Sequence, residues 1–451
     1  MADSKKFLFL PLALAAALLW LQFSIRPPQL KTGLDFYWAA YWASHYGPDF
    51  CRRSLLGTLL SPLGEIASQY DFIAVLAWAA MLVFWFRLTV PVIRFLRPLS
   101  LRFQCLFVTA ILLSPAWTAL LIEIVGDPLQ VVFAVFLLLL ADFIRRDLFP
   151  TWYGLLWFAF GVAASLVHEA SAFFMLPCLA TAVWLDGGSG KRKALMACLA
   201  GLLVGVLSIV AFGKHSCFES GGIAIRKGQA LPKWTTVRGR ERYLGLFPAP
   251  ADMTLTFEEV NPSTVRTFQE LLGNQQRYFF SQGFPHGLYL IVWRLCAVMI
   301  VPLAQSWVVC SLLEWFKSQP TETTAGVLVN WLRFYGLPLV CTFPLWMIGS
   351  DWGRFAGYSL MLQTVVLCLE CPRQNSNDGG SKVKALPGRL ICQGVLLSAF
   401  SAYCTVPELT TYRIWGLNQV WPLLRAGAGF IVVFFGVSVA QHFMRRGATE
   451  S

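Results

Sequence analysis

Long runs of apolar residues are the feature that most constrains the fold of this 451-residue chain. A helix needs about 20 apolar residues to cross the ~30 Å hydrocarbon core of a bilayer, and most of the runs approach that length. Only 13% of the residues are charged, whereas a soluble protein carries about 25%. Twelve runs can be drawn, at 7–25, 72–95, 102–122, 128–145, 152–167, 170–185, 194–213, 287–313, 327–348, 353–370, 389–406 and 422–442. We therefore expect an all-α fold, a polytopic transmembrane helical bundle of about 11–12 spans.

Two of these runs leave the number of spans open. The runs 152–167 and 170–185 are short, and they fit either two helices or one long element kinked at His168 and Glu169. The first run, Phe7–Ile25, has the length of a signal peptide, but no small-residue cleavage site and soluble domain follow it. We interpret it as a membrane helix.

The distribution of Lys and Arg predicts the orientation of the chain, because cytoplasmic connections are enriched in these residues. With Lys5 and Lys6 placed in the cytoplasm, 18 positive residues fall on the inner side and six in the short outer segments. The long segment 214–286 falls on the outer side and carries nine more, but long loops are translocated largely regardless of charge. Both termini are therefore predicted to be cytoplasmic.

This topology divides the chain into an N-terminal transmembrane half at 1–213, an extracytoplasmic loop at 214–286 and a C-terminal transmembrane half at 287–451. Pro, Gly and mixed charge in the loop predict irregular structure with a short helix, for instance Pro262–Phe280. A further helical stripe, in Cys51–Gln69, is too short to span and is expected to lie in the outer interface.

The net charge of +12 does not require a nucleic-acid partner. Much of it is the inner-face bias, which faces the anionic head groups of membrane lipids. The nine positive residues of the long loop are separate, and they are suited to attracting an anionic substrate.

Ionisable residues occur in four connections that are predicted to lie on the outer face. Such groups are costly at membrane depth, and they generally face a cavity or a partner. Four short turns that carry acids, bases or both therefore predict one shared polar site just above the membrane. The residues are Asp35, Asp49, Arg52 and Arg53 in the first connection, Asp127 in the second, His168 and Glu169 in the third, and Asp351 and Arg354 in the fourth.

Each of these motifs also has a purely structural explanation. His168 and Glu169 can close a tight turn, and Asp127 can form a turn in which Pro128 opens the next helix. Asp351 and Arg354 can form a local ion pair, and the two arginines at 52–53 can extend to lipid head groups. The occurrence of all of them on one predicted face favours a substrate site.

Carboxylates and arginines together suit one kind of chemistry. A carboxylate activates a hydroxyl group by accepting its proton, and arginine binds phosphate through paired, charge-assisted hydrogen bonds. These functions fit group transfer from a lipid-phosphate carrier to an alcohol acceptor at the outer leaflet. The sequence shows no nucleotide-binding glycine loop, so a cytosolic nucleotide-sugar donor is disfavoured. No cofactor is implied, although carboxylates of this kind can also bind a divalent metal such as Mg²⁺ or Mn²⁺.

At these residues the chain resembles bacterial polytopic glycan-assembly proteins. The segment "GLDFYWAAYWASHYGPDF" (Gly33–Phe50) is similar to the first outer loop of GT-C type glycosyltransferases, which use polyprenyl-phosphate sugars. The segments "GDPLQVVFAVFLLLL" and "HEASAFFMLP" are similar to polysaccharide polymerases of the EpsG/Wzy type. The resemblance covers roughly residues 30–180, and "DWGR" is a further point of similarity. It implies that Asp35, with Asp49 as the reserve, is the catalytic base.

The resulting hypothesis is a membrane enzyme of the bacterial inner (plasma) membrane that transfers sugar from a polyprenyl-phosphate-linked donor to a glycan or lipid acceptor. Aromatic residues of the outer segments, among them Trp38, Tyr41 and Trp42, are candidates either for stacking on sugar rings or for an interfacial belt. The predicted catalytic residues are Asp35, Asp49, His168 and Glu169, and the predicted substrate-binding residues are Arg52, Arg53, Asp127, Asp351 and Arg354.

Two other functions were weighed. A transporter or flippase of lipid-linked glycans would carry polar residues near the middle of the membrane, and Arg294, Arg333, Arg425 and Gln305 fall within predicted spans. An intramembrane aspartyl protease is echoed by "QYD", "VGD" and "KALP", but the third of these belongs to a hydrophilic loop on the other predicted side.

Overall fold

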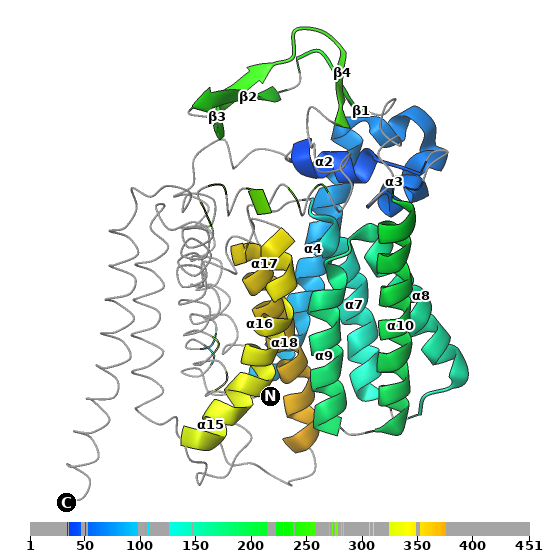
Figure 1. Cartoon of the computed structure of the whole chain (residues 1–451), viewed down its shortest axis with the longest axis vertical. Coiled ribbons are helices and arrows are strands. Elements are labelled where there is room, and N and C mark those ends of the chain that lie inside the picture. Colours follow the sequence, from blue (N-terminus) through cyan, green and yellow to red (C-terminus); the bar gives the residue numbers. More distant parts are fainter. Residues whose placement is uncertain are drawn as a thin grey trace, which may run out of the picture. The chain divides into compact units, whose positions relative to one another are not determined.

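The computed structural model of the chain is mostly helical (Figure 1). It describes residues 34, 36–46, 50, 53–97, 126–146, 148–186, 188–213, 222–228, 230–237, 240–257, 324–348 and 352–375, with isolated positions at 104, 107, 270, 273, 276, 277, 281, 283, 306 and 310. The chain separates into two compact units, each assembled from distant segments. The first unit comprises Met1–Ile25, Thr89–Leu121 and Gln276–Ser451, and the second comprises Arg26–Leu88 and Ile122–Gln275.

The second unit is built on helices that run in alternating directions (Figure 1). Helix α7 is followed by α8, α9 and α10 after short connections, so each helix returns along its predecessor. The start of α4, the starts of α7 and α9 and the ends of α8 and α10 consequently lie at one end, which we call the site end. The helices are α2 (Phe36–Ala43), α3 (Leu55–Leu60), η2 (Ser61–Ser68), α4 (Tyr70–Leu96), α7 (Pro128–Arg145), α8 (Thr151–Val167), α9 (Ser171–Asp186) and α10 (Ser189–Phe212).

The predicted helices of the second unit agree with the structure where the structure describes them. The runs at 72–95, 128–145 and 194–213 correspond to α4, α7 and α10, and the ambiguous segment 152–185 forms two helices, α8 and α9, joined by a tight turn. The runs at 7–25, 389–406 and 422–442 and both termini lie outside the described residues, as do 102–122 and 287–313 apart from isolated positions.

The predicted short helix after Cys51 is present as α3, and it continues as the 3₁₀ helix η2. The segment is not one regular helix, because the backbone of Gly64 within η2 is non-helical, with a positive φ of 61°. The apolar side chains of Leu59, Leu63 and Ile66 are largely exposed along this segment.

Glycines allow α8 and α10 to pack closely. A Cβ atom on Gly201 would lie 2.1 Å from the carbonyl oxygen of Phe158, and one on Gly205 would lie 2.6 Å from the Cβ of Ser165. The hydroxyl of Ser165 also donates a hydrogen bond to the carbonyl of Leu202 across the interface, at 3.1 Å. Small residues and interhelical hydrogen bonds of this kind are typical of helices that pack in a membrane, where apolar side chains gain little by leaving lipid.

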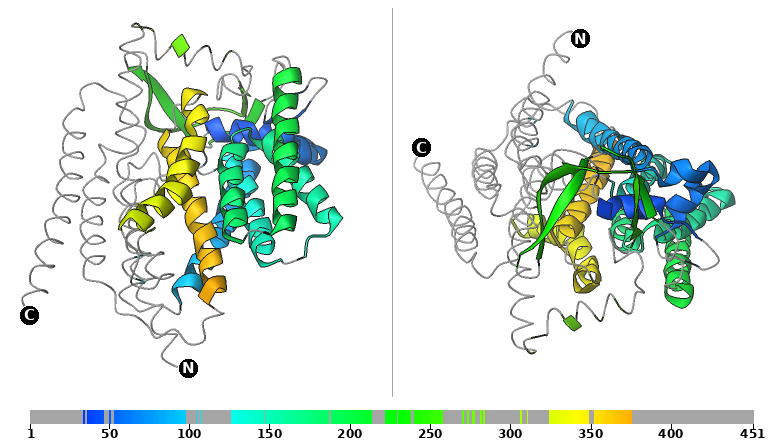
Figure 2. Two further views of the ribbon diagram at one scale, coloured as in Figure 1. Left: turned by 60° about the horizontal axis from the view of Figure 1, so that its bottom comes forward. Right: turned by 90° about the horizontal axis from the view of Figure 1, so that it is seen from above.

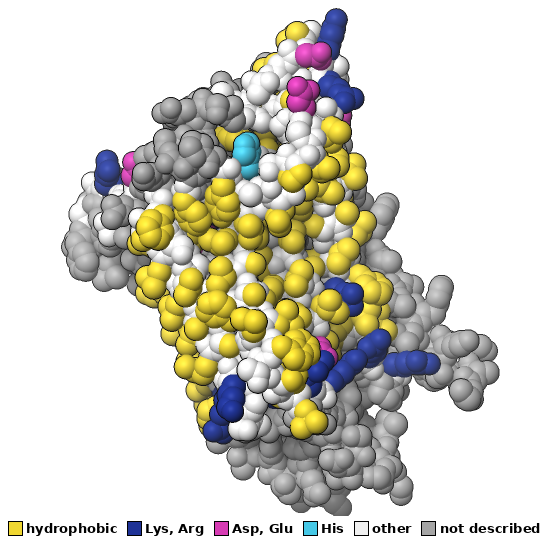
Figure 3. Space-filling model, turned by 90° about the vertical axis from the view of Figure 1, so that its right-hand side faces the viewer, with side chains coloured by type: hydrophobic (Ala, Val, Ile, Leu, Met, Phe, Trp, Pro, Cys, Tyr) yellow, Lys and Arg dark blue, Asp and Glu magenta, His cyan; other side chains and the backbone are white. Residues whose placement is uncertain are grey.

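Three helices of the described part, α4, α7 and α10, are long and apolar enough to cross a membrane. Large apolar side chains point away from the protein on their outer sides, for example Leu82 and Phe86 on α4 and Leu207 and Val210 on α10. Figure 3, which views one side of the molecule, shows a broad band of apolar side chains with most of the charged side chains toward its two ends. A soluble protein would cover such a band, so the second unit has the surface of a membrane protein.

The fold is not purely helical, because the described part of the segment after α10 contains four strands, β1 (Gly222–Ile225), β2 (Ala230–Val237), β3 (Arg240–Pro248) and β4 (Met253–Thr256). Strands β2 and β3 pair antiparallel with Val237 opposite Arg240, and β1 pairs antiparallel with β4. Strand β1 contacts α2 and η2, which places the β1–β4 pair at the site end (Figure 2). For this segment the sequence predicts irregular structure, and the four strands differ from that prediction. The predicted helix at Pro262–Phe280 lies outside the described residues apart from isolated positions.

The described helices of the first unit are α15 (Thr324–Trp331), η4 (Leu332–Gly336), α16 (Leu337–Cys341), α17 (Phe343–Ile348) and α18 (Trp352–Asn375). The predicted spans 327–348 and 353–370 fall here, but the former is interrupted by the single π-helical turn η4 and again at Thr342. The hydroxyl groups of Tyr335 in η4 and Thr364 in α18 lie 3.0 Å apart, so a hydrogen bond joins the two elements.

Candidate functional site

An ion pair between Arg53 and Glu169 lies at the site end of the second unit. The guanidinium donates from Nε to Oε2 of Glu169 at 2.8 Å and from one terminal nitrogen to Oε1 at 2.5 Å. The other terminal nitrogen donates to the hydroxyl of Tyr41 in α2 at 2.5 Å. Each charged side chain is only 11% exposed. One guanidinium group therefore joins α2 and the segment before α3 to a turn that lies 116 positions further along the chain.

The backbone of Arg53 is strained. Its φ of 61° makes it the one non-glycine residue with a positive φ in the described part of the chain. An L-residue with a side chain pays about 1–2 kcal/mol for the left-handed conformation, which persists only where the surroundings impose it. The next residue, Ser54, precedes α3, and close packing of Gly57 against the carbonyl of Ser44 fixes α3 on the chain that leaves α2. This arrangement holds the arginine in place to face Glu169.

His168 and Glu169 form the turn between α8 and α9. His168 ends α8 with an extended backbone, and Ser171 secures the turn by donating its hydroxyl to the carbonyls of His168 and Ala164. The backbone N–H of Ala170 donates to Nδ1 of His168 at 3.2 Å, which assigns the ring proton of the neutral tautomer to Nε2. His168 is almost fully buried, and its Nδ1 lies 3.8 Å from Oε2 of Glu169. Imidazole and carboxylate are thus neighbours without sharing a hydrogen bond.

Asp127 is the N-cap of α7. Its Oδ1 accepts a hydrogen bond from the backbone N–H of Leu129 at 3.0 Å, and the residue is completely buried. Gly126 precedes Asp127 and has a positive φ of 92°, a conformation that glycine adopts readily. The indole of Trp42 donates a hydrogen bond to the carbonyl of Gly126 at 2.6 Å. Because Trp42 follows Tyr41 in α2, this helix connects the turn at Asp127 with the Arg53–Glu169 pair. The contact with Leu129 makes Asp127 a helix cap, which is the structural one of the two roles that the sequence predicts for it.

The remaining predicted site residues fall outside what is described. Asp35, Asp49, Arg52 and Asp351 are not among the described residues, and Arg354 lies in α18 with an undescribed side chain. The structure therefore brings together four of the predicted residues, Arg53, Asp127, His168 and Glu169, within one unit.

The aromatic residues of α2 are used for packing. Trp38, Tyr41 and Trp42 are at most 5% exposed, so their rings have no free face for stacking on a sugar. Tyr41 also lies under the guanidinium of Arg53, which is 5.0 Å from its ring centre. Sequence reasoning overlooked this supporting role, because no local signal distinguishes Tyr41 from the apolar residues around it.

A buried phenol lies in the connection between α2 and α3. Tyr46 stacks on Phe50 with ring centres 5.0 Å apart, and its backbone N–H donates to the hydroxyl of Thr58. Burial raises the pKa of the Tyr46 phenol to about 12. Tyr46 is therefore a neutral phenol at physiological pH, and it does not serve as an anionic base.

The opposite end of the second unit is basic. Lys191 at the start of α10 is buried and donates to the carbonyl of Ile144 in the last turn of α7, at 3.0 Å. A cation is stabilised there by the negative end of the helix dipole. Arg145, Arg146 and Arg192 lie at the same end. The acid-bearing turns and the basic connections of this unit are consequently separated by the length of the helices, in agreement with the predicted charge pattern.

Within the described residues, no group of three or more His, Cys, Asp and Glu side chains is arranged to hold a metal ion. The chain matches no protein-family model, no curated protein and no solved structure. The function of the chain is therefore inferred from the residues of the site themselves.

Proposed function

We propose that the chain is a multi-pass glycosyltransferase or polysaccharide polymerase of the bacterial inner membrane, which transfers sugar from a polyprenyl-phosphate-linked donor to a glycan or lipid acceptor on the outer face. The observation that carries this proposal is the Arg53–Glu169 pair, in which a phosphate-binding group and a carboxylate are held together at one end of a membrane-type helix bundle. The resemblance to glycan-assembly proteins gives the same chemistry for the same segments.

The two charges have complementary tasks in such a reaction. The acceptor hydroxyl attacks the anomeric carbon of the donor, a carbon–oxygen bond forms there, and the bond to the phosphate oxygen breaks. The electron pair of that bond leaves with polyprenyl phosphate, and the hydroxyl proton passes to Glu169 as general base. Arg53 donates hydrogen bonds to the phosphate, whose charge grows as it leaves. Asp35, to which the resemblance assigns the base, is the alternative proton acceptor.

The nearby groups support this division. Glu169 is paired with a guanidinium that a phosphate can engage in the same bidentate manner, so arrival of the donor would release the carboxylate for the acceptor. His168 buries its ring beside Glu169, where it excludes water and orients the turn.

The test is reconstitution of the purified full chain in lipid vesicles with a panel of polyprenyl-phosphate sugars and short acceptors, with mass spectrometry of the products. We expect product from at least one donor. Arg53→Lys keeps the charge but loses the bidentate geometry, and we expect it to lower kcat/KM for the donor about 10- to 100-fold. Arg146→Lys, at the basic end, is the matched control and should behave as wild type. No product from any donor, or equal kcat/KM for the two variants, would refute the proposal.

A transporter or flippase of lipid-linked glycans is the second candidate, because the first unit has a polar interior. Gln363 of α18 is fully buried, and its side-chain amide has no hydrogen-bond partner among the described residues. The contacting turn η4 is π-helical, a deformation that is frequent at functional sites, and it contains the predicted span residue Arg333. Arg294, Arg425 and Gln305 lie outside the described residues.

The two functions differ in one measurable step. A transporter moves intact lipid-linked glycan between the leaflets of a vesicle and forms no new glycosidic bond. Gln363→Leu should stop such movement if the first unit transports, whereas it should leave product formation unchanged if the site at Arg53 and Glu169 is catalytic. Movement of lipid-linked glycan without product would replace the enzyme proposal by the transport proposal.

A further inference from the structure

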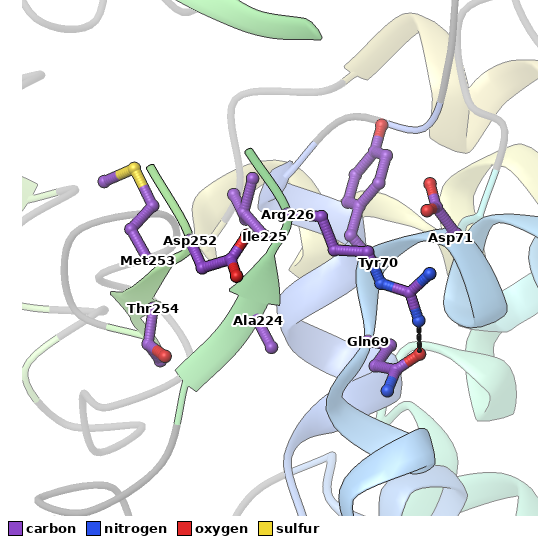
Figure 4. A pocket seen from close by; sticks show the side chains of 9 residues that line it. All are labelled: Gln69, Tyr70, Asp71, Ala224, Ile225, Arg226, Asp252, Met253 and Thr254. Carbon is purple, nitrogen blue, oxygen red and sulfur yellow. Dashed lines mark hydrogen bonds between the residues drawn. The ribbon is translucent and has the colours of Figure 1, made fainter. Parts of the chain in front are cut away.

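A cavity lies at the site end, apart from the Arg53–Glu169 pair. It has a volume of about 430 Å³ and lies between the β1–β4 strands and the junction of η2 with α4 (Figure 4). A parallel bridge between Gln69 and Ala224 and a 2.8 Å hydrogen bond from Arg226 to the side-chain oxygen of Gln69 hold its two walls together. All of its lining belongs to the second unit. Its volume lies within the range of about 300–1,000 Å³ that is usual for small-molecule sites.

The polar groups of this cavity are mixed in charge. Asp71 lies in the first turn of α4, and Asp252 lies in the turn before β4. Arg226 supplies hydrogen-bond donors, and Gln69 supplies a side-chain amide. The turn that carries Asp252 is ordered, because its Oδ1 accepts a hydrogen bond from the backbone N–H of Lys227 at 2.6 Å. Apolar surface is contributed by Ile225 and Met253.

This composition selects a class of ligand. A phosphate or another anion would meet two carboxylates, and an apolar ligand would leave several polar groups without partners. A neutral sugar fits, because each hydroxyl both donates to carboxylates and accepts from guanidinium and amide groups, while its C–H faces cover apolar side chains.

The cavity is joined to the proposed catalytic pair through α2. The hydroxyl of Tyr70, on the cavity wall, donates to the carbonyl of Leu34 just before α2, at 2.5 Å. Tyr41 in α2 accepts from Arg53. With eight residues, α2 is about 12 Å long, a distance that a few linked sugar units can cover.

We propose that this cavity is a binding subsite for the neutral sugar units of the acceptor glycan, remote from the unit that reacts. The inference rests on the proposed function for the role of the glycan as acceptor, but not for its binding. Asp252 and Asp71 accept hydrogen bonds from sugar hydroxyls, and Arg226 donates to sugar oxygens. A growing or pre-formed chain held here would be presented to the Arg53–Glu169 pair along α2.

The test is a binding experiment that requires no turnover. Purified full chain in detergent is titrated with neutral oligosaccharides of glucose, galactose, rhamnose or N-acetylglucosamine and observed by saturation-transfer NMR. We expect wild type to bind at least one of these series. Asp252→Asn should weaken that binding about tenfold or more, because a hydrogen bond to a charged group is lost. The asparagine oxygen can still accept from the N–H of Lys227, so the turn is preserved.

A control and a second variant complete the experiment. Glu65→Gln, on exposed η2 outside the cavity, removes the same charge nearby and should leave binding unchanged, and Asp71→Asn should weaken it from the opposite wall. Binding that is absent from wild type for every series, or equal in Asp252→Asn, Asp71→Asn and Glu65→Gln, overturns the subsite.

The subsite and the proposed reaction can fail separately. Oligosaccharide binding that depends on Asp252, without product from any donor, would keep the subsite and reject glycosyl transfer. Product formation without such binding would keep the enzyme and reject the subsite. Glu169→Gln should retain oligosaccharide binding, since Glu169 does not line the cavity.

Discussion

The ion pair between Arg53 and Glu169 is expected to be strongly coupled. Its two oxygen contacts are 2.8 and 2.5 Å long, and each side chain is only 11% exposed. Removal of one partner would leave the other charge largely buried, which costs about 3–5 kcal/mol when burial is complete. We therefore expect Arg53→Met and Glu169→Gln each to destabilise the protein by about 2–4 kcal/mol, since a small part of each side chain still contacts water.

The double variant separates coupling from the effects of the single changes. Once both charges are gone, neither remains uncompensated, so the double variant should be less destabilised than the sum of the singles. We expect a coupling free energy of about 2–3 kcal/mol, at the upper end of the range for residues in contact. The assay is equilibrium unfolding in mixed micelles followed by tryptophan fluorescence, for which the chain has 18 tryptophans.

The chain offers a matched control for this cycle. Arg146 and Asp142 also form an ion pair, at 3.0 Å, but one helical turn apart and with side chains 32% and 46% exposed. Exposed pairs of this spacing are only weakly coupled, because water and salt screen the two charges. A coupling at Arg53–Glu169 no larger than that measured for Arg146→Met with Asp142→Asn would refute the idea that the site end is held together by a buried pair.

Three further outcomes follow from the packing. Gly201→Ala should destabilise the protein by about 1–3 kcal/mol, because its Cβ would lie 2.1 Å from the carbonyl oxygen of Phe158. Gly154→Ala, in the same pair of helices, should stabilise it by up to about 1 kcal/mol, because a Cβ there would enter open space. Equilibrium unfolding of the two variants side by side checks both expectations. Asp127→Ala should cost about 1 kcal/mol through loss of the helix cap, and Asp127→Asn much less, by the same assay. Tyr46→Phe should be neutral or stabilising below pH 10, because the buried hydroxyl has no hydrogen-bond partner among the described residues. Since burial raises the folded pKa of Tyr46 to about 12, the stability of wild type relative to this variant should fall as the pH rises from about 10 toward 12, and an unchanged difference over that range would contradict the burial.

The helical part of the fold could be predicted because its signal is local. Long apolar runs define α4, α7 and α10, and the pattern of Lys and Arg predicted that the ends at Arg145 and Lys191 lie opposite the turn at His168. The strands were missed because β1 and β4 are only four residues long, and prolines and charged residues interrupt the apolar residues of β2 and β3. Only the pairing of segments supplies their stability.

Arg53 and Glu169 could be selected from the sequence as candidates, but their pairing could not be predicted. Arg53 and Glu169 were singled out because charges in short turns between membrane helices are costly, and that argument does not state which charges pair. A contact across 116 positions depends on the path of α2 and α3, which no periodicity reveals. Asp127 shows the opposite case, in which the local motif of an acid before a proline already explains the residue as a helix cap.

The measurement that tests the account most directly is the initial rate of sugar transfer by Glu169→Gln in lipid vesicles, compared with wild type at equal amounts of folded protein. Glutamine keeps the shape of the side chain and one acceptor oxygen for Arg53, but it cannot take up the proton of the acceptor hydroxyl. The account predicts a rate lower by a factor of about 10²–10⁴, with oligosaccharide binding retained. A variant that transfers sugar as fast as wild type would contradict it.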